Sequence, residues 1–226
     1  KRREALEHLF FHEIQVLAGG LDCSARRLVE HPEHTLVTAR QIQYFSSQLS
    51  QEVLGQRILL GAEDGTLVPE PVDVNVRGIL AELRAVFEGH EAAHGRRLAT
   101  DVGPAGMLRA DRVLLLRVLA NLVKNALEAI PEGASAQVWY EAGEGERRFV
   151  VQNPGVISGD VAPRIFQRSF STKASRGRGL GTFGAKLLAE KYLGGRLDFR
   201  SDDQGGTRFI LHLPPDEAEN LAPPVE

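Results

Sequence analysis

Two asparagines, Asn121 and Asn125, lie four residues apart in the segment NLVKNALEA. On a helix this spacing places both side-chain amides on one face. An amide oxygen is a suitable ligand for Mg²⁺, which usually keeps several waters and shares phosphate oxygens. The pair could instead be two ordinary surface or capping asparagines. The spacing alone favours that simpler interpretation.

A glycine-rich segment, GRGLG at 177–181, leads into the apolar segment GTFGAKLLAE. Glycines let backbone N–H groups approach phosphates, and the start of a helix favours negative charge. Positive charge lies nearby on Arg168, Lys173, Arg176 and Arg178. The spacing lacks the Gly-Lys-Ser/Thr of a P-loop and the βαβ context of a dinucleotide fingerprint. It indicates either a different kind of phosphate site or a flexible basic loop.

A third segment, VVQNPGV, carries Asn153 at the end of a predicted strand, followed by Pro154 and Gly155. A polar side chain beside a glycine at a strand end could meet a flat base. Asn-Pro-Gly is also well suited to an ordinary turn. On its own this segment does not separate the two interpretations.

The first part of the chain predicts a helical hairpin. Apolar residues recur at helical spacing from Leu6 to Leu28, and again from Ile42 to Ile58, with Pro32 between the two stretches. We expect this hairpin over residues 1–60, followed by a linker at 61–71. Such a hairpin exposes an apolar face, so pairing with a second copy into a four-helix bundle is the natural solution.

The remaining chain alternates between predicted strands and helices, which indicates a second domain of mixed α/β type. Strands are expected at PVDV, RRLATDV, AQVWYEA, RRFVVQN, GRLDFRS and TRFILHLP. Helices are expected at 75–92, at 111–130 with Asp111 near its start, and over GTFGAKLLAEKYL. The tail at 215–226 is acidic and proline-rich, and we expect it to be disordered.

Composition sets wider limits. The 226 residues carry a net charge of -3, so nothing suggests a nucleic-acid partner. Cys23 is the only cysteine, which rules out an internal disulfide and fits a reducing compartment. No apolar stretch is long enough to span a bilayer, and the chain opens in helical register. We expect a cytoplasmic segment that reaches a membrane only through an upstream region, if at all.

The three segments, in this order and on these elements, resemble the ATP-binding domain of bacterial sensor histidine kinases. Its Bergerat fold, an α/β sandwich, is shared with gyrase, MutL and Hsp90-type ATPases. NLVKNALEA resembles the N box, NPG a reduced first glycine box, RIFQRSFSTK the F box and lid, and GRGLG the second glycine box. The resemblance covers about 72–214 and implies an α+β chain that binds ATP and Mg²⁺. It assigns Mg²⁺ to Asn125, and nucleotide binding to Asn121, Asn125, Asn153, Gly155, Lys173, Gly177, Gly179, Leu180 and Gly181.

The same resemblance points upstream to FFHEIQVLAGG as an H box. It implies that His12 is the phosphoacceptor, with Glu13 taking the proton from the other ring nitrogen. Helical periodicity places His12 away from the apolar face, although His8 shares nearly the same side. The implied function is ATP-dependent autophosphorylation of His12 and transfer of the phosphate to an aspartate in the receiver domain of a response regulator, by a homodimeric kinase.

Two departures from the family pattern matter. The family usually has an aspartate where this chain has Asn153, although an amide oxygen can also accept a hydrogen bond from adenine. Many H boxes carry a proline where this chain has Leu17, and Gly19-Gly20 could supply similar flexibility. The alternative is a phosphotransfer protein, or an ATP-binding scaffold without kinase activity, with a degenerate ATP site. The stimulus, the partner regulator and cis or trans phosphorylation are not encoded in recognisable form.

Overall fold

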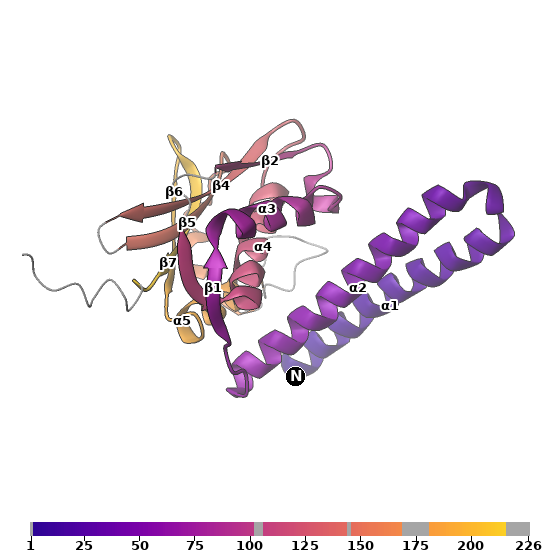
Figure 1. Cartoon of the computed structure of the whole chain (residues 1–226), viewed down its shortest axis with the longest axis horizontal. Coiled ribbons are helices and arrows are strands. Elements are labelled where there is room, and N and C mark those ends of the chain that lie inside the picture. Colours follow the sequence, from indigo (N-terminus) through magenta and orange to yellow (C-terminus); the bar gives the residue numbers. More distant parts are fainter. Residues whose placement is uncertain (1, 102–105, 144–145, 169–180, 216–226) are drawn as a thin grey trace, which may run out of the picture. The chain divides into compact units, whose positions relative to one another are not determined.

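The computed structural model in Figure 1 describes residues 2–101, 106–143, 146–168 and 181–215. Side chains are described from Ile14 onward within these ranges, except at 32, 47, 48 and 51. The chain divides into two compact units, Lys1–Leu67 and Val68–Glu226. We describe each unit by itself. The tail that we expect to be disordered lies almost entirely outside the described residues.

The first unit is the expected helical hairpin. Helix α1 (Arg2–Glu30) and helix α2 (Thr35–Asp64) are joined by the short 3-10 helix η1 (Pro32–His34). Helix α2 runs past the expected end at residue 60 and stops at Gly65, whose positive φ of 73° lets its N–H bond back to the Gly61 carbonyl. None of the described helices is both long and apolar enough to cross a membrane.

Gly20 makes space for a neighbouring side chain and does not interrupt helix α1. Helix α1 runs unbroken through Gly19 and Gly20. A Cβ atom at Gly20 would lie 2.6 Å from Cε1 of Phe45, whereas one at Gly19 would meet nothing within 4 Å. Glycine at position 20 therefore lets the Phe45 ring of α2 approach the α1 backbone closely.

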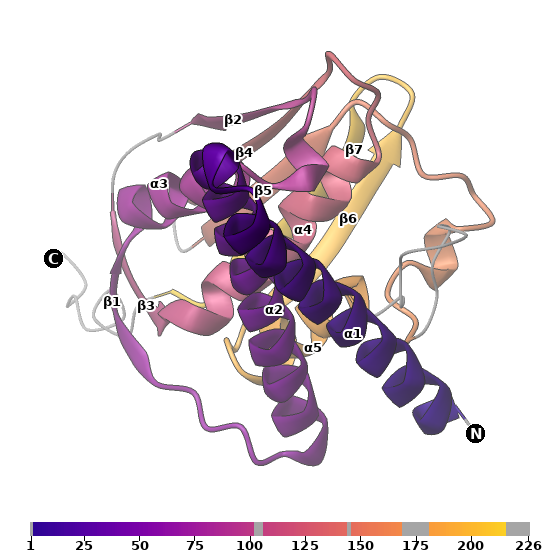
Figure 2. The same cartoon turned by 90° about the vertical axis from the view of Figure 1, so that its right-hand side faces the viewer.

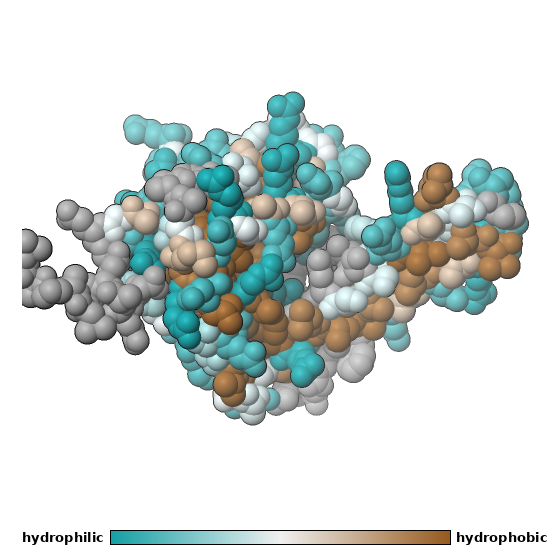
Figure 3. All heavy atoms as spheres, viewed as in Figure 1, coloured by the Kyte–Doolittle hydropathy of each residue, from teal (hydrophilic) through white to brown (hydrophobic). Residues whose placement is uncertain are grey.

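Several large apolar side chains of the hairpin stay exposed, as the brown spheres along both helices in Figure 3 show. They are Val16, Val29, Leu36, Val37, Val53, Leu54 and Leu60. Exposed large apolar side chains can mark interaction sites on soluble proteins where they gather into a patch. The hairpin therefore offers apolar surface that a second copy could cover.

The second unit is built on a five-stranded sheet with strand order β2-β4-β5-β7-β6. Its strands are β2 (Arg97–Asp101), β4 (Ser135–Gly143), β5 (Glu146–Asn153), β6 (Arg196–Asp202) and β7 (Gly206–Leu213). Strand β2 pairs parallel with β4, and the other neighbours are antiparallel. Helices α3 (Val76–Phe87), α4 (Arg112–Glu128) and α5 (Gly181–Lys191) lie together on one side of this sheet in Figure 2.

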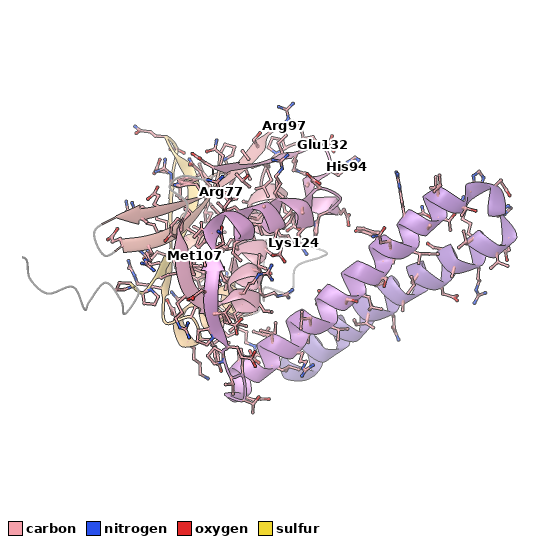
Figure 4. All side chains as sticks on the ribbon, in the orientation of Figure 1. Arg77, His94, Arg97, Met107, Lys124 and Glu132 are labelled. Carbon is pink, nitrogen blue, oxygen red and sulfur yellow. The ribbon has the colours of Figure 1, made fainter. Side chains whose placement is uncertain are left out.

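A second, two-stranded sheet pairs β1 (Pro71–Asn75) with β3 (Met107–Asp111) in antiparallel register. Sequence patterns predict β1 but not β3, a strand of the same length whose partner lies far away in the sequence. The turn into β2 is tight: Gly95 has a φ of 69°, and a Cβ atom there would approach Cγ of Glu132 to 3.0 Å. Figure 4 shows Glu132 near His94 and Arg97 at this end of the unit.

Helix α4 forms the centre of the core. Eight of its residues are buried: Leu114, Leu115, Val118, Leu119, Leu122, Val123, Ala126 and Leu127. Asp111 caps its start, because Oδ1 accepts hydrogen bonds from the N–H groups of Val113 at 2.9 Å and Leu114 at 3.0 Å. The second oxygen, Oδ2, accepts from the N–H of Glu70 at 2.8 Å and so ties the start of α4 to the chain before β1.

Replacement of this cap should destabilise the second unit. Asp111→Ala removes three acceptor contacts, and we expect a loss of about 1–2 kcal/mol in unfolding free energy. Urea denaturation followed by fluorescence measures it, because the only tryptophan, Trp139, lies on β4. Asp73→Ala is the control, since its ion pair with Arg109 spans 3.4 Å on the surface and should contribute below about 0.5 kcal/mol. Equal losses in the two variants would contradict the capping role.

Candidate functional site

Asn121 and Asn125 face the first residue of helix α5. A Cβ atom at Gly181 would lie 3.7 Å from Nδ2 of Asn125 and 4.0 Å from Oδ1 of both asparagines. The four-residue spacing on α4 thus places both amides on the face that meets the start of α5, as the sequence predicts. Glycine at position 181 directs no side chain toward the two amides, whereas the Cβ atom of any other residue would be in van der Waals contact with them.

The Asn125 amide is buried without being satisfied by the described part of the chain. Its Nδ2 atom is shielded from solvent and has no hydrogen-bond partner among the described residues. A buried polar atom without a partner costs about 1–3 kcal/mol, which a bound ligand can offset. Two amide oxygens and one amide nitrogen, all within 4.0 Å of the Cβ position of Gly181, suit phosphate oxygens and a hydrated Mg²⁺ ion. The residues present therefore fit both groups.

The start of α5 favours negative charge, because the first N–H groups of a helix and the positive end of its dipole point outward there. Thr182, which is buried, fixes this end by donating a hydrogen bond from Oγ1 to the carbonyl of Ile165. Phe166, the residue after Ile165, packs edge-on against Phe199 and Phe209. Lys186 of α5 covers its ring at 4.7 Å from the centroid. The described part of the F-box segment is therefore anchored to α5 and to the sheet.

Asn153 ends strand β5 and is almost fully buried, with 3% of its surface exposed. It lies in register with Thr207 of β7, which in turn lies in register with Ser201 of β6. Thr207 is 2% exposed and donates from Oγ1 to the Gly155 carbonyl at 2.7 Å. A row of three polar side chains thus crosses one end of the sheet.

Two glycines bring the backbone close at this end. A Cβ atom at Gly155 would lie 2.9 Å from Nδ2 of Asn153 and 3.1 Å from the carbonyl oxygen of Ala129, the residue that follows α4. Gly206 has a φ of 67°, and a Cβ atom there would lie 2.2 Å from the Asn153 carbonyl oxygen. Both positions require glycine, so the turn after Asn153 is pressed against the end of α4.

His90 lies at the start of the 3-10 helix η2 (Glu91–Ala93), and its Nδ1 accepts from the Ala92 N–H at 3.0 Å. Burial lowers the pKa of His90, and the charge of Lys124 on α4 lowers it further, whereas Glu128 and Glu91 oppose both effects. Lys124, visible in Figure 4, precedes Asn125 directly. A neutral imidazole therefore accompanies this lysine at pH 7.

Several predicted site residues cannot be placed relative to this geometry. Lys173, Gly177, Gly179 and Leu180 lie outside the described residues. His12 and Glu13 lie on α1 in the other unit, and their side chains are not among those described. The structure therefore brings together Asn121, Asn125 and Gly181 at one end, and Asn153 with Gly155 at the other.

Sequence reasoning missed Thr207 and Ser201. The segment GGTRFILHLP predicts only a closing strand. The usable indication was a hydroxyl residue directly after Gly205-Gly206, because a glycine pair that permits close backbone approach often adjoins a site. Register between β5, β7 and β6 then completes the row, and register is not visible in a single sequence.

The family model of the histidine kinase-, DNA gyrase B- and HSP90-like ATPases matches residues 110–217. This range contains both asparagines of α4, Asn153, Gly155 and the row of polar residues. It confirms the resemblance proposed from the three sequence segments.

Sensor kinases are similar over a longer stretch. The sensor protein VanSB of Enterococcus faecalis is 31% identical over 166 residues, covering 70% of this chain and 36% of that protein. The phosphate regulon sensor protein PhoR of Pseudomonas aeruginosa is 26% identical over 225 residues, covering 94% of this chain and 51% of that protein. The chain thus spans about half or less of the length of these relatives.

Solved structures agree with these relatives. The catalytic domain of histidine kinase ThkA is 26% identical with a TM-score of 0.57, covering 65% of this chain and 96% of that one. Full-length ShkA in complex with AMPPNP has the same fold, with 23% identity, a TM-score of 0.65, and coverage of 94% of this chain and 46% of that one. Residues 110–217 are therefore a GHKL ATPase domain, and the chain belongs to the sensor histidine kinases.

Proposed function

We propose that this chain is the catalytic core of a sensor histidine kinase, which binds ATP, phosphorylates its own His12 and passes the phosphate to an aspartate of a response regulator. The observation that carries the proposal is the meeting of Gly181 with the amides of Asn121 and Asn125, where the buried Nδ2 of Asn125 has no hydrogen-bond partner among the described residues. Such a cradle at a helix start suits a polyphosphate and its metal. A helical hairpin with a histidine precedes it in the same chain.

In this proposal the two ends of the site bind different parts of the nucleotide. Asn153 accepts a hydrogen bond from the base, and the turn at Gly155 lies beside it. Asn125 and Asn121 hold Mg²⁺ and phosphate oxygens at the start of α5. Lys173, Gly177, Gly179, Leu180 and Gly181 complete the phosphate side. A bound Mg²⁺ ion would neutralise phosphate charge during transfer.

The chemical step is a phosphoryl transfer to nitrogen. One ring nitrogen of neutral His12 forms a bond to the γ-phosphorus, the bond from that phosphorus to the bridging oxygen breaks, and ADP leaves. The ring proton on the other nitrogen passes to Glu13. Catalysis is then mainly positioning and charge stabilisation, because the reaction needs little covalent chemistry from the protein.

A receiver domain is the natural acceptor in this scheme. The histidine kinase ThkA, whose structure in complex with the response regulator protein TrrA has the same fold as this chain at a TM-score of 0.59 and 22% identity, is one such pair. The exposed apolar residues of the hairpin support a homodimer with a four-helix bundle. The placement of Asn121 and Asn125 against Gly181 favours a working kinase over a phosphotransfer protein or scaffold with a degenerate site. A cytoplasmic location is part of the same proposal.

His12→Gln should abolish acid-labile phosphate labelling. The chain is incubated with radiolabelled ATP and Mg²⁺, and the label is mapped by peptide. Binding of ATP should survive in this variant, because His12 is not part of the nucleotide site. His8→Gln is the matched control and should keep the label. Loss of label with His8→Gln but not with His12→Gln would assign the phosphoacceptor to His8, and ATP binding without any label would favour the scaffold.

Asn125→Ala should weaken Mg²⁺-dependent ATP binding by at least about tenfold, since an interaction between a polar side chain and a charged partner disappears. Isothermal titration calorimetry with and without Mg²⁺ measures the change. Gln137→Ala, on the exposed side of β4, is the control and should bind as the unmodified chain does. If Asn125→Ala bound ATP with the same affinity and the same Mg²⁺ dependence, Asn125 would not be the metal ligand.

Val16→Glu combined with Val53→Glu should convert a dimer into a monomer. Both side chains are about half exposed, at 57% and 47%, and a charge on each would prevent burial against a second hairpin. Light scattering at micromolar concentration reports the mass. Phe45 is unsuited to this test because it packs inside its own hairpin against Gly20. Arg57→Glu is the charge-changing control. A monomeric unmodified chain would contradict dimerisation.

A further inference from the structure

Asn153 poses a problem of orientation that a carboxylate would not. An amide presents an acceptor on one side and a donor on the other, whereas both oxygens of a carboxylate accept. Adenine carries an amino group at position 6, which donates. A 6-oxopurine carries a carbonyl there, which accepts. The side of the amide that faces the base therefore decides which purine an asparagine selects.

The Gly155 carbonyl settles the orientation in this structure. Nδ2 of Asn153 donates to that oxygen at 3.4 Å. Rotation of the amide by 180° would place Oδ1 there instead and bring two acceptors together. The bond itself is long, so the orientation depends on the carbonyl staying in place. The arrangement keeps Oδ1 on the other side of the amide, as an acceptor.

Two hydroxyl groups hold that carbonyl. Thr207 donates from Oγ1 to the Gly155 oxygen at 2.7 Å, so its single proton is used there. Ser201 lies 2.9 Å from Thr207, oxygen to oxygen, and must donate to it. Ser201 Oγ in turn accepts from the Ile157 N–H at 2.8 Å. The hydrogen bonds therefore run in one direction, from Ile157 through Ser201 and Thr207 to Gly155.

The surrounding strands make this relay rigid. Ser201 pairs with Thr207, and Thr207 with Asn153, in the register of β6, β7 and β5. The turn between β6 and β7 is closed by Asp202, whose Oδ1 accepts from the N–H groups of Gln204 at 3.0 Å and Gly205 at 2.6 Å. The relay is therefore anchored on ordered backbone at both ends, in a place where Asn153 and Thr207 are buried.

We propose that Ser201 and Thr207 are positioning residues that lock the Asn153 amide through the Gly155 carbonyl, and so make the site selective for 6-aminopurine nucleotides over 6-oxopurine nucleotides. The inference rests on the proposed nucleotide site and adds its base selectivity. Ser201 acts at a distance: it sets the carbonyl that sets the amide, and the amide meets the base. An asparagine needs this lock because only one of its two amide atoms is an acceptor. A carboxylate at the same position would have two equivalent acceptor oxygens and would need no lock.

The test compares ATP with inosine triphosphate, which has an oxygen at position 6. Dissociation constants for both are measured by calorimetry with Mg²⁺. The unmodified chain should prefer ATP. Ser201→Ala should reduce that preference by about fivefold, the factor of one neutral hydrogen bond, because the amide can then rotate. Thr207→Val should do the same, and Ser201→Thr, which keeps the hydroxyl, should restore the preference. Ser135→Ala on β4 is the matched control and should leave the preference unchanged.

An Asn153→Asp background separates the lock from general damage. A carboxylate has two equivalent acceptors, so Ser201→Ala should leave the ATP preference of that variant within about twofold. An equal fall in both backgrounds, or none with Asn153, overturns the lock while the proposed ATP site stands. Absence of ATP binding by the unmodified chain overturns the proposed function itself. Urea denaturation followed at Trp139 confirms folding, and Thr207→Val replaces Ser201→Ala if the latter does not fold.

Discussion

The burial of helix α4 is the constraint on which the rest of the second unit depends. Eight of its residues are buried in the core, so the helix has little freedom to rotate or slide. That burial fixes the remaining face, where Asn121 and Asn125 look toward the start of α5. It also fixes the residue after the helix, Ala129, against which the turn at Gly155 is pressed. One buried helix thereby sets the position of both ends of the proposed nucleotide site.

The two ends of the proposed site differ physically in the way that the phosphates and the base of a nucleotide differ. At the start of α5, the two amides include a buried nitrogen without a partner in the described part of the chain, and the helix dipole is favourable for negative charge, which together suit charged groups. At the end of β5, a directed chain of hydrogen bonds runs from the Ile157 N–H through Ser201 and Thr207 to the Gly155 carbonyl. A charge needs a compensating field, whereas a neutral base needs donors and acceptors in a fixed pattern. Helix termini supply the first, and sheet register supplies the second.

Features with a local cause could be predicted from the sequence. The Asn121–Asn125 pair, the Asp111 cap, the β4–β5 hairpin and the helical hairpin each follow from spacing within a short segment. Features that arise between distant segments could not. Strand β3 exists because β1 lies beside it, the polar row exists because β5, β7 and β6 are in register, and Gly20 matters because Phe45 lies across from it. The low helix propensity of the glycine pair in α1 predicts flexibility. In the structure, Gly20 instead makes space for the Phe45 ring.

The replacement of a carboxylate by Asn153 changes the energetics of the buried sheet end in two opposing ways. Burying an ionised carboxylate at 3% exposure is costly unless it is fully hydrogen-bonded, and the neutral amide removes that cost. The amide has one acceptor atom where a carboxylate has two equivalent ones, so its orientation decides whether an acceptor faces the base in the proposed site. The groups around Asn153 must then fix the orientation of its amide. The Gly155 carbonyl fixes it, held by Thr207 and Ser201, and glycine at position 155 is what allows that carbonyl to lie so close to the amide. In the proposed site, the neutral Asn153 side chain and the ordered polar row therefore belong together: the first lowers the cost of burial, and the second fixes the orientation that the two equivalent oxygens of a carboxylate would not need.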